Sequence, residues 1–367
     1  MLPESPGSPG ISHTVKMLAI IEQWEVGSGC HTDNSEKYLL LILFKLGLDI
    51  MVFYLCCWKP SASFLNMCSQ SVIMADTVMA FSLASVWYLG AERSPVSTCF
   101  LLAHASATYG ALPLPMMFLG LLDYCLQDTY RCNQSAIFRC PRNAVLIVLG
   151  WMLAVLYSFG SVKNELIEVD LTTETKALVC EVEESTLITY FILVLFMVVL
   201  CVMLPFWSSI PQWLKEADTL AKMREEQENQ RNDLFISTQC TETKISEGYY
   251  LEEIIRPPPS LWLSLMLGFG MFWMPYLAMS VICQVFGFGV PAYITFNLLW
   301  LECANSLIMG VLFWAKANTL GPDRNIPKNV CLWHIYWYLS KRTQQQQQQQ
   351  RPIAVLKPSK DNALLHV

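Results

Sequence analysis

The sequence has little charge for its length. Only 15% of its 367 residues are charged, whereas an ordinary soluble chain carries about 25%. Soluble chains of this size keep a charged surface, so the composition excludes an ordinary soluble protein. The 24 basic and 30 acidic residues give a net charge of −6, and this balance excludes a nucleic-acid partner, which would require a basic face.

The sequence also lacks motifs for metal binding and catalysis. Its 14 cysteines include no Cys-x-x-Cys pair, and its five histidines are scattered. There is no His-Glu-x-x-His, no Gly-x-Ser-x-Gly and no phosphate-binding loop. A structural zinc site is therefore not expected, and we predict a protein that is not an enzyme and has no metal cofactor, with one exception considered below.

Long apolar runs are what the sequence does contain. Hydrophobic residues make up 54% of the chain, and its mean hydropathy is +0.37. A helix needs about 20 mostly apolar residues to cross a bilayer, where it satisfies its own backbone hydrogen bonds. Seven runs qualify, and we predict an all-α bundle of seven membrane-spanning helices in membrane lipid. The runs are 38–58, 64–89, 98–126, 144–162, 186–207, 261–286 and 291–315.

Basic residues predict the orientation, because they are retained on the cytoplasmic side. With the amino terminus outside, eighteen basic residues face the cytoplasm and five face the exterior, and Lys45 lies within a span. We therefore predict a plasma-membrane protein with an extracellular tail over 1–37 and a seven-span domain over 38–316. A cytoplasmic tail follows over 317–367.

The segments predicted to be cytoplasmic contain further signals. The loop 208–259 begins with a charged helical pattern over 215–233, which predicts a helical extension of the fifth span followed by a flexible linker. Residues 316–341 are partly amphipathic, which predicts a short helix along the inner leaflet. Cys331 in this segment is a candidate for palmitoylation, with an unmodified cysteine as the open alternative. Seven glutamines over 344–350 predict a disordered tail.

Several motifs resemble the rhodopsin-like G-protein-coupled receptors. Asp123-Tyr124-Cys125 closes the third span where this family has Asp-Arg-Tyr, and Trp273-Met274-Pro275 resembles its Trp-x-Pro hinge in the sixth span. Other short motifs resemble orphan members of the family. These are Thr108-Tyr109-Gly110, Asp123-Tyr124-Cys125-Leu126 and Pro291-Ala292-Tyr293-Ile294.

This resemblance implies specific pairings and partners. It implies a disulfide between Cys99, which opens the third span, and Cys180 in the next outer loop. Cys30 is then either free or paired with Cys283. The resemblance also implies a heterotrimeric G protein or arrestin as the cytoplasmic partner. Tyr124 replaces the arginine that contacts the G protein, and a phenol lacks its charge, so we expect atypical or weak coupling.

Ionisable residues inside the spans are functional candidates, because burying them in a membrane is costly. Lys45 and Asp49 lie four residues apart on one helix face, which predicts that they pair. By the resemblance, Asp76 joins Asn305 around a sodium ion or water. Two buried carboxylates cannot both be ionised cheaply, so we expect Asp49, Asp76 and Asn305 to form a polar core that is either protonated or occupied by sodium.

The outer cavity is the expected ligand site, because pockets in helix bundles form between helices. Ser106 stands where amine receptors carry an acid, which makes a monoamine ligand unlikely. Thirteen acids face five bases on the predicted outer segments, so the surface would attract a cationic peptide. Candidate ligand-binding residues are Trp87, His104, Tyr109, Tyr276, Gln284 and Tyr293.

Two other function classes stay open at this stage. A ligand-independent seven-span scaffold is favoured by the missing arginine at Tyr124. A transporter is less favoured, because many transporters carry internal repeats and none relates the early spans of this chain to the later ones. The sequence does not name the ligand or the effector.

Overall fold

A computed structural model describes residues 16–57, 64–90, 96–129, 136–162, 165–172, 174–234, 259–317 and 331–349. The chain forms two compact units. Unit 1 comprises Met1–Val198 and Trp273–Val311, and unit 2 comprises Val199–Phe272 and Leu312–Val367. Most of the predicted flexible linker lies outside the described residues.

Seven helical segments are long and apolar enough to cross a membrane, which confirms the predicted number of spans. Many of their large apolar side chains face outward; Phe44 and Phe81, for example, are 73% and 75% exposed. Outward-facing apolar side chains are expected where lipid is the solvent. The segments are Ser35–Leu55, Phe64–Leu89, Thr98–Asp123, Cys140–Ser161, Thr186–Phe206, Leu261–Val285 and Leu298–Lys316.

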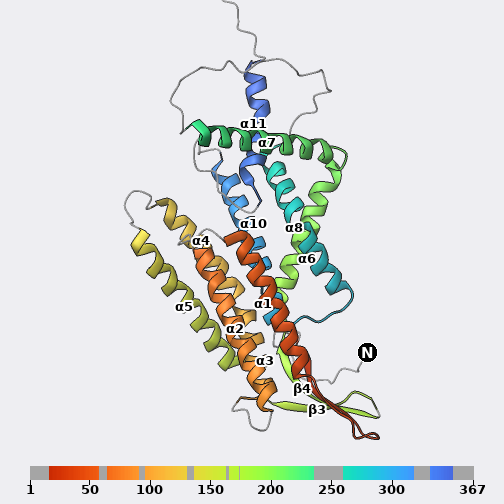
Figure 1. Ribbon diagram of the computed structural model, residues 1–367. Helices are drawn as coiled ribbons and strands as arrows, with labels where there is room; N and C mark the ends of the chain where they lie inside the picture. Colours follow the sequence, from red (N-terminus) through yellow and green to blue (C-terminus); the bar gives the residue numbers. More distant parts are fainter. Residues whose placement is uncertain are drawn as a thin grey trace, which may run out of the picture. The chain divides into compact units, whose positions relative to one another are not determined.

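The helices are drawn in Figure 1. Those wholly in unit 1 are α1 (Ser35–Cys57), α2 (Phe64–Leu89), α3 (Thr98–Ala111), α4 (Pro113–Thr129), α5 (Ala136–Ser161) and α9 (Ala292–Thr295). The helices α6 (Thr186–Met203), α8 (Leu261–Val285) and α10 (Leu298–Lys316) contribute to both units.

A proline interrupts the third predicted span, and the helix of the seventh begins later than predicted. The third consists of α3 and α4, which separate at Leu112 because Pro113 has no backbone N–H to continue the helix. The seventh was predicted to start at Pro291, but α10 begins only at Leu298. Phe296 is extended after the short helix α9, and the side chain of Asn297 caps α10 by accepting a hydrogen bond from the Trp300 amide at 2.9 Å.

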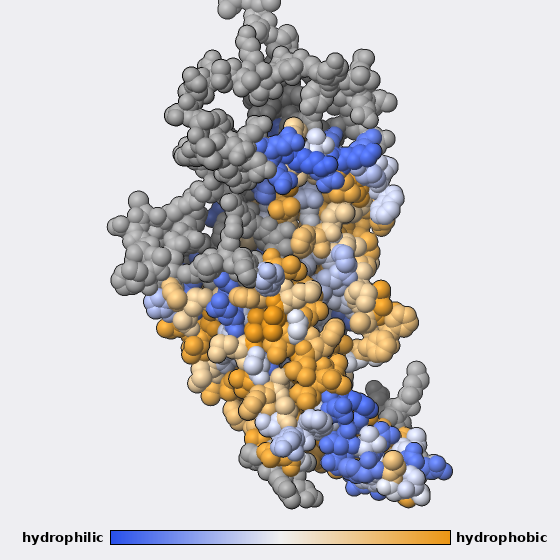
Figure 2. All heavy atoms as spheres, viewed as in Figure 1, coloured by the Kyte–Doolittle hydropathy of each residue, from blue (hydrophilic) through white to orange (hydrophobic). Residues whose placement is uncertain are grey.

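Part of the predicted extracellular tail is folded into a sheet in unit 1. The four strands are β1 (Lys16–Glu25), β2 (His31–Asp33), β3 (Leu166–Asp170) and β4 (Thr175–Glu183), in the order β2-β1-β4-β3 with antiparallel neighbours. Figure 2 shows hydrophilic residues gathered over this sheet and apolar residues over the unit 1 helices. The sequence analysis missed the sheet, because its two pairs of neighbouring strands, β1 with β2 and β3 with β4, are more than 100 residues apart in the chain and only their pairing defines the sheet.

Unit 2 contains two helices that follow predicted spans. A 3₁₀ turn (η1, Leu204–Phe206) separates α6 from α7 (Ile210–Leu234). Pro205 lies in this turn and removes a backbone donor, so α7 is a separate helix rather than the predicted continuous extension. The second helix, α11 (Trp333–Gln349), runs into the polyglutamine segment that was predicted to be disordered.

The predicted inner-leaflet helix is wrong in its environment. Trp333, Ile335, Trp337 and Leu339 of α11 are all buried. Consecutive members of this set lie about 200° apart around a helix of 3.6 residues per turn, so they cover two opposite sides, whereas a surface helix buries one face. Cys331 is only 2% exposed, which favours the alternative of an unmodified cysteine, and palmitoylation of this thiol stays a prediction.

Candidate functional site

A buried charged cluster joins α1, α2 and α3 in unit 1. The Lys45 Nζ donates a hydrogen bond to Asp76 Oδ1 at 2.7 Å, and the Tyr109 hydroxyl donates to the same oxygen at 2.6 Å. Lys45 also lies over the Tyr109 ring, 4.4 Å from its centroid. Asp76 is 0% exposed and Lys45 is 4% exposed, so the ion pair is shielded from solvent and strengthened by the low dielectric.

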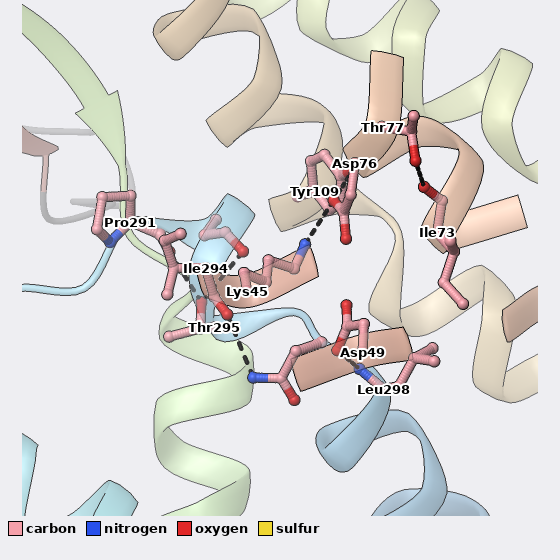
Figure 3. Close-up of polar contacts among 12 residues, drawn as sticks. Lys45, Asp49, Ile73, Asp76, Thr77, Tyr109, Pro291, Ile294, Thr295 and Leu298 are labelled. Carbon is pink, nitrogen blue, oxygen red and sulfur yellow. Dashed lines mark hydrogen bonds and ion pairs between the residues drawn. The ribbon is translucent and has the colours of Figure 1, made fainter. Parts of the chain in front are cut away.

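This arrangement corrects the predicted pairing of Lys45 with Asp49. The flexible lysine chain reaches from α1 to α2, which packs beside it, and binds Asp76 (Figure 3). Asp49 has a different role: its Oδ1 accepts a hydrogen bond from the Leu298 amide at 3.0 Å. A helix start has unpaired amides and a partial positive charge, so a carboxylate of α1 stabilises the start of α10.

One oxygen of each carboxylate remains unused. Asp49 Oδ2 and Asp76 Oδ2 are buried and have no hydrogen-bond partner among the described residues. Figure 3 shows an oxygen of each pointing toward the other, and the two side chains are close enough to interact. Asn305 is only half-buried and makes no hydrogen bond to either aspartate, so the structure brings together two members of the predicted polar core and leaves out the third.

Glu302 is a buried acid that the sequence analysis missed. It lies one turn beyond Leu298 in α10, is buried, and is close enough to Cys68 of α2 to interact electrostatically. The rule applied to Asp49 and Asp76, that an ionisable residue within a span is a functional candidate, identifies Glu302 as well. The described spans of unit 1 therefore bury Glu302 in addition to Asp49, Asp76 and Lys45.

The sheet is attached to α3 near this cluster. The disulfide between Cys99 and Cys180 is present, with a Cα–Cα distance of 5.6 Å, as the resemblance implied. Further along β4, the Glu183 amide donates to the Ser106 hydroxyl at 3.0 Å. Ser106 is completely buried, so β4 covers the position that the family resemblance placed in the ligand cavity.

The sheet is also fastened to α1 and to the loop before α9. The Ile20 carbonyl accepts hydrogen bonds from Asn34 and from the Tyr38 hydroxyl, at 3.2 and 3.1 Å. Met17 packs so closely on Gly289 that an added Cβ would lie 2.4 Å from its sulfur. Strand β1 therefore rests on the same end of unit 1 as β4.

The six candidate ligand-binding residues do not form one group. Tyr109 belongs to the charged cluster, and Trp87 is 51% exposed on α2. His104 contacts Ser158, Phe100 and Phe159. Tyr276 packs edge-on against Trp273, with ring centroids 6.3 Å apart.

The two remaining candidates, Tyr293 and Gln284, carry buried polar atoms. The Tyr293 hydroxyl and Gln284 Oε1 have no hydrogen-bond partner among the described residues. Burial raises the pKa of Tyr293, which lies close to Tyr38. These atoms remain candidates for ligand contacts.

Cys30 and Cys283 are not bonded to each other, so the predicted alternative of a disulfide between them is wrong.

The Asp123 end of the third span has a partner that the sequence analysis did not identify. Arg142 of α5 donates a hydrogen bond to Asp123 and forms an ion pair with it. The Asp123 carboxylate is therefore paired with an arginine of α5. In the family motif Asp-Arg-Tyr, this carboxylate contacts the arginine that follows it in the sequence. Tyr124 and Cys125 lie in α4, but their side chains are outside the described residues.

The residues of the predicted hinge lie in α8. Pro275 lies inside this helix, where a proline removes a backbone hydrogen bond and favours a kink. Trp273, two residues before it, is buried.

Comparison with known proteins gives the chain its relatives. No family model matches the sequence. Three proteins named probable G-protein coupled receptor 160 are similar along most of their length. The rat protein is 23% identical over 295 residues, covering 78% of this chain and 82% of the relative. The human protein is 20% identical over 300 residues, with the same coverage, and the mouse protein is 22% identical over 309 residues, covering 80% and 85%.

The chain is a seven-span homologue of these receptors. The conclusion combines the three similarities with the seven membrane-capable helices and the disulfide. The relatives are named as receptors and not as enzymes. At this level of identity the receptor homologue shares an architecture with its relatives, and its ligand and coupling need arguments of their own.

Proposed function

We propose that this receptor homologue lies in the plasma membrane, with its amino terminus outside, and transmits the binding of an extracellular ligand to a cytoplasmic partner. The observation that carries the proposal is the charged cluster linking Lys45, Asp49 and Asp76 to the start of α10. It connects three spans directly below the sheet-covered end. A ligand that binds one arrangement of these helices better than another shifts their populations.

The acidic residues of the four-stranded sheet indicate the class of ligand. Ten acidic residues lie on or beside the four strands, against two lysines. Lys176 is the basic partner of Glu168 and Asp170, at 2.9 and 3.9 Å, and the His31 Nε2 lies 3.1 Å from Glu22 Oε2, so acidic residues outnumber basic ones over the sheet. Such a surface attracts cations, which supports a cationic peptide that binds to the sheet side.

A binding screen tests the ligand class. Secreted peptides, basic and acidic, are applied to cells expressing the receptor, and bound peptide is measured at low and physiological salt. We expect basic peptides to bind, with affinity falling as salt rises. Retained binding of a hit by a variant with Glu22, Glu25, Glu181 and Glu183 changed to Gln would contradict a role for the acids. The variant Glu216→Gln in α7 is the matched control.

The proposal includes a proton or a sodium ion between the unused oxygens of Asp49 and Asp76. Carboxylates buried this close are stabilised when one proton or one cation lies between them. Among the described residues no three His, Cys, Asp or Glu side chains form a metal-binding group, so water or backbone oxygens would have to complete a sodium site.

Thermal unfolding in detergent tests the proton or sodium ion. The melting temperature is measured across pH and with sodium replaced by a large organic cation at constant ionic strength. We expect the wild type to depend on pH or sodium and Asp49→Asn to lose that dependence while keeping the cap of α10. Equal responses of the two proteins would sink this part of the proposal.

Coupling to a G protein is expected to be weak. Asp123 is engaged by Arg142 of α5, and Tyr124 lacks the charge of an arginine. The variant Tyr124→Arg tests this, with basal G-protein signalling as the readout and Tyr124→Phe as the control. A rise in signalling supports a receptor with damped coupling.

A ligand-independent membrane scaffold is the second candidate. It is favoured by the burial of Ser106 under β4, because the chain itself covers the expected ligand position. No change in signalling with Tyr124→Arg, combined with no peptide hit in the screen, would favour the scaffold over the receptor.

A further inference from the structure

The carboxyl-terminal helix α11 is enclosed by three other helices of unit 2. Leu339 is completely buried in an apolar cluster with Trp213 of α7 and with Leu263 and Leu267 of α8. On another side of α11, Trp337 packs edge-on against Phe313 of α10, with ring centroids 5.3 Å apart. Contacts on opposite sides are what an inserted helix shows, and a helix resting on a surface lacks them.

A glycine of α8 makes room for this helix. A Cβ added to Gly268 would lie 2.7 Å from two ring carbons of Tyr336, a distance at which the ring would have to move. The Tyr336 ring therefore rests directly on the α8 backbone. Burial raises the pKa of Tyr336, and Asp218 of α7 is among the neighbouring groups, so this residue lies between α8 and α7.

The entry to α11 is also held by packing. Leu332 has a φ of +49°, a left-handed conformation that is strained for a side-chain-bearing residue. On either side of it, Cys331 and Trp333 are buried. Strain of this kind persists only where the surroundings impose it, so the first turn of α11 is seated rather than loosely docked.

We propose that α11 is an intramolecular plug, which occupies the groove between α7, α8 and α10 and keeps a cytoplasmic partner from binding there. The inference rests on the proposed orientation, which puts these ends of the helices in the cytoplasm. The groove fits a helix with large aromatic residues four apart, as Trp333 and Trp337 are. Activation then requires α11 to leave, and the resting protein is silent.

Cys331 reports whether the plug is seated. Full-length protein in detergent is treated with a maleimide, and the modification of each cysteine is followed by mass spectrometry. We expect Cys331 to react at least about tenfold more slowly than the exposed Cys140, because it must first open to solvent. Equal rates in the wild type would overturn the proposal.

The variant Gly268→Leu should displace the plug. The new side chain takes the place of the Tyr336 ring, so Cys331 becomes reactive and the recruitment of tagged Gα subunits or arrestins in cells increases. The matched control is Gly47→Leu, at a helical glycine whose added Cβ meets nothing within 4 Å. Should Gly268→Leu not fold, Trp337→Ala removes the contact with Phe313 and is expected to act in the same direction.

A cross-link provides the opposite test. Cγ of Tyr336, the ring atom bonded to its Cβ, lies 3.1 Å from the Cβ that Gly268 would carry. The double variant Gly268→Cys, Tyr336→Cys can therefore form a disulfide. Oxidation should keep Cys331 unreactive and recruitment low, and reduction should reverse both effects. Increased reactivity of Cys331 without increased recruitment would overturn the inhibitory role. The peptide screen scores the proposed receptor function separately, because it reads binding at the sheet.

Discussion

The charged cluster of unit 1 and the apolar cluster of unit 2 hold their helices together by different physical means. In the first, Lys45, Asp49 and Asp76 make directional contacts between few atoms. In the second, Trp213 and Leu339 exclude solvent without any directional bond. Directional charged contacts fail abruptly when one partner is lost, whereas apolar packing weakens in proportion to the volume removed.

The difference indicates which cluster suits which task. A cluster of charged groups with unused carboxylate oxygens offers alternative pairings, which is what a ligand-biased switch needs. An apolar seat that releases a helix as a whole suits a removable plug. Substitutions in the two clusters can break or sharpen this contrast.

The largest effect is expected from Lys45→Met. It removes the only lysine of the cluster and leaves Asp76 buried without its cation, at a cost of about 3–5 kcal/mol. The measurement is the melting temperature in detergent. The double variant Lys45→Met, Asp76→Asn should recover much of the loss, and a single variant as stable as the wild type would show that the ion pair is unimportant.

A somewhat smaller loss is expected from Leu339→Ala in the apolar cluster. Truncating a fully buried leucine costs about 2–4 kcal/mol. Here this loss is expected to weaken the packing of α11 in its groove and not the folding of the other helices. We therefore expect faster maleimide modification of Cys331 with little change in the melting temperature of the whole protein. The exposed Leu332→Ala is the control. A large drop in melting temperature would mean that α11 is not a removable part.

Two substitutions of Asp49 distinguish the effect of its hydrogen bond to the start of α10 from the effect of its negative charge. Asp49→Leu loses the hydrogen bond to the Leu298 amide and should cost about 1–2 kcal/mol. Asp49→Asn keeps an acceptor oxygen and should lose less than half of that. The two melting temperatures are compared, and equal losses would show that the charge matters more than the cap.

The contact between the sheet and α3 is expected to be weaker. Ser106→Ala removes the acceptor of the Glu183 amide and should cost about 1 kcal/mol. Hydrogen–deuterium exchange at the end of β4 should rise locally, and exchange in β1 beyond Met17 should not. Unchanged exchange at Glu183 would mean that the disulfide alone holds β4.

The smallest effect is expected at Lys176. Its hydrogen bond to Glu168 raises its pKa, so any stabilisation is present below pH about 10.5 and is lost as the pH rises through the raised pKa. Exposed pairs contribute little, and we expect Lys176→Met to melt like the wild type at pH 7. A clear loss at pH 7 that persists above pH 11 would point to packing instead of charge.

The spans and several local sites could be predicted from the sequence because their signals are local. Apolar runs, Pro113 and Pro275 act on the backbone where they stand. The start of the seventh span was predicted wrongly, because the apolar run from Pro291 hides the break at Phe296 that separates α9 from α10. Glu302 was missed, although the rule for ionisable residues in spans would have found it.

Partner choice could not be predicted from spacing. Lys45 and Asp49 have the spacing of a helical pair, yet Lys45 binds Asp76 because α2 packs beside α1. The amphipathic pattern after the last span predicted a surface helix, but buried residues lie on two opposite sides of α11, with Trp333 and Trp337 on one and Ile335 and Leu339 on the other. Helices α7 and α8 provide the apolar surface around Leu339, and α10 contacts Trp337.

The sequence by itself determined that this chain crosses a membrane seven times, because hydrophobic length acts on each segment separately. It also determined which ionisable residues lie inside the spans. Only the tertiary structure decided that Asp49 caps α10, that β1 joins β4 and that α11 is enclosed. These features depend on contacts between segments far apart in the chain, and no local pattern encodes which of several possible partners a buried group meets.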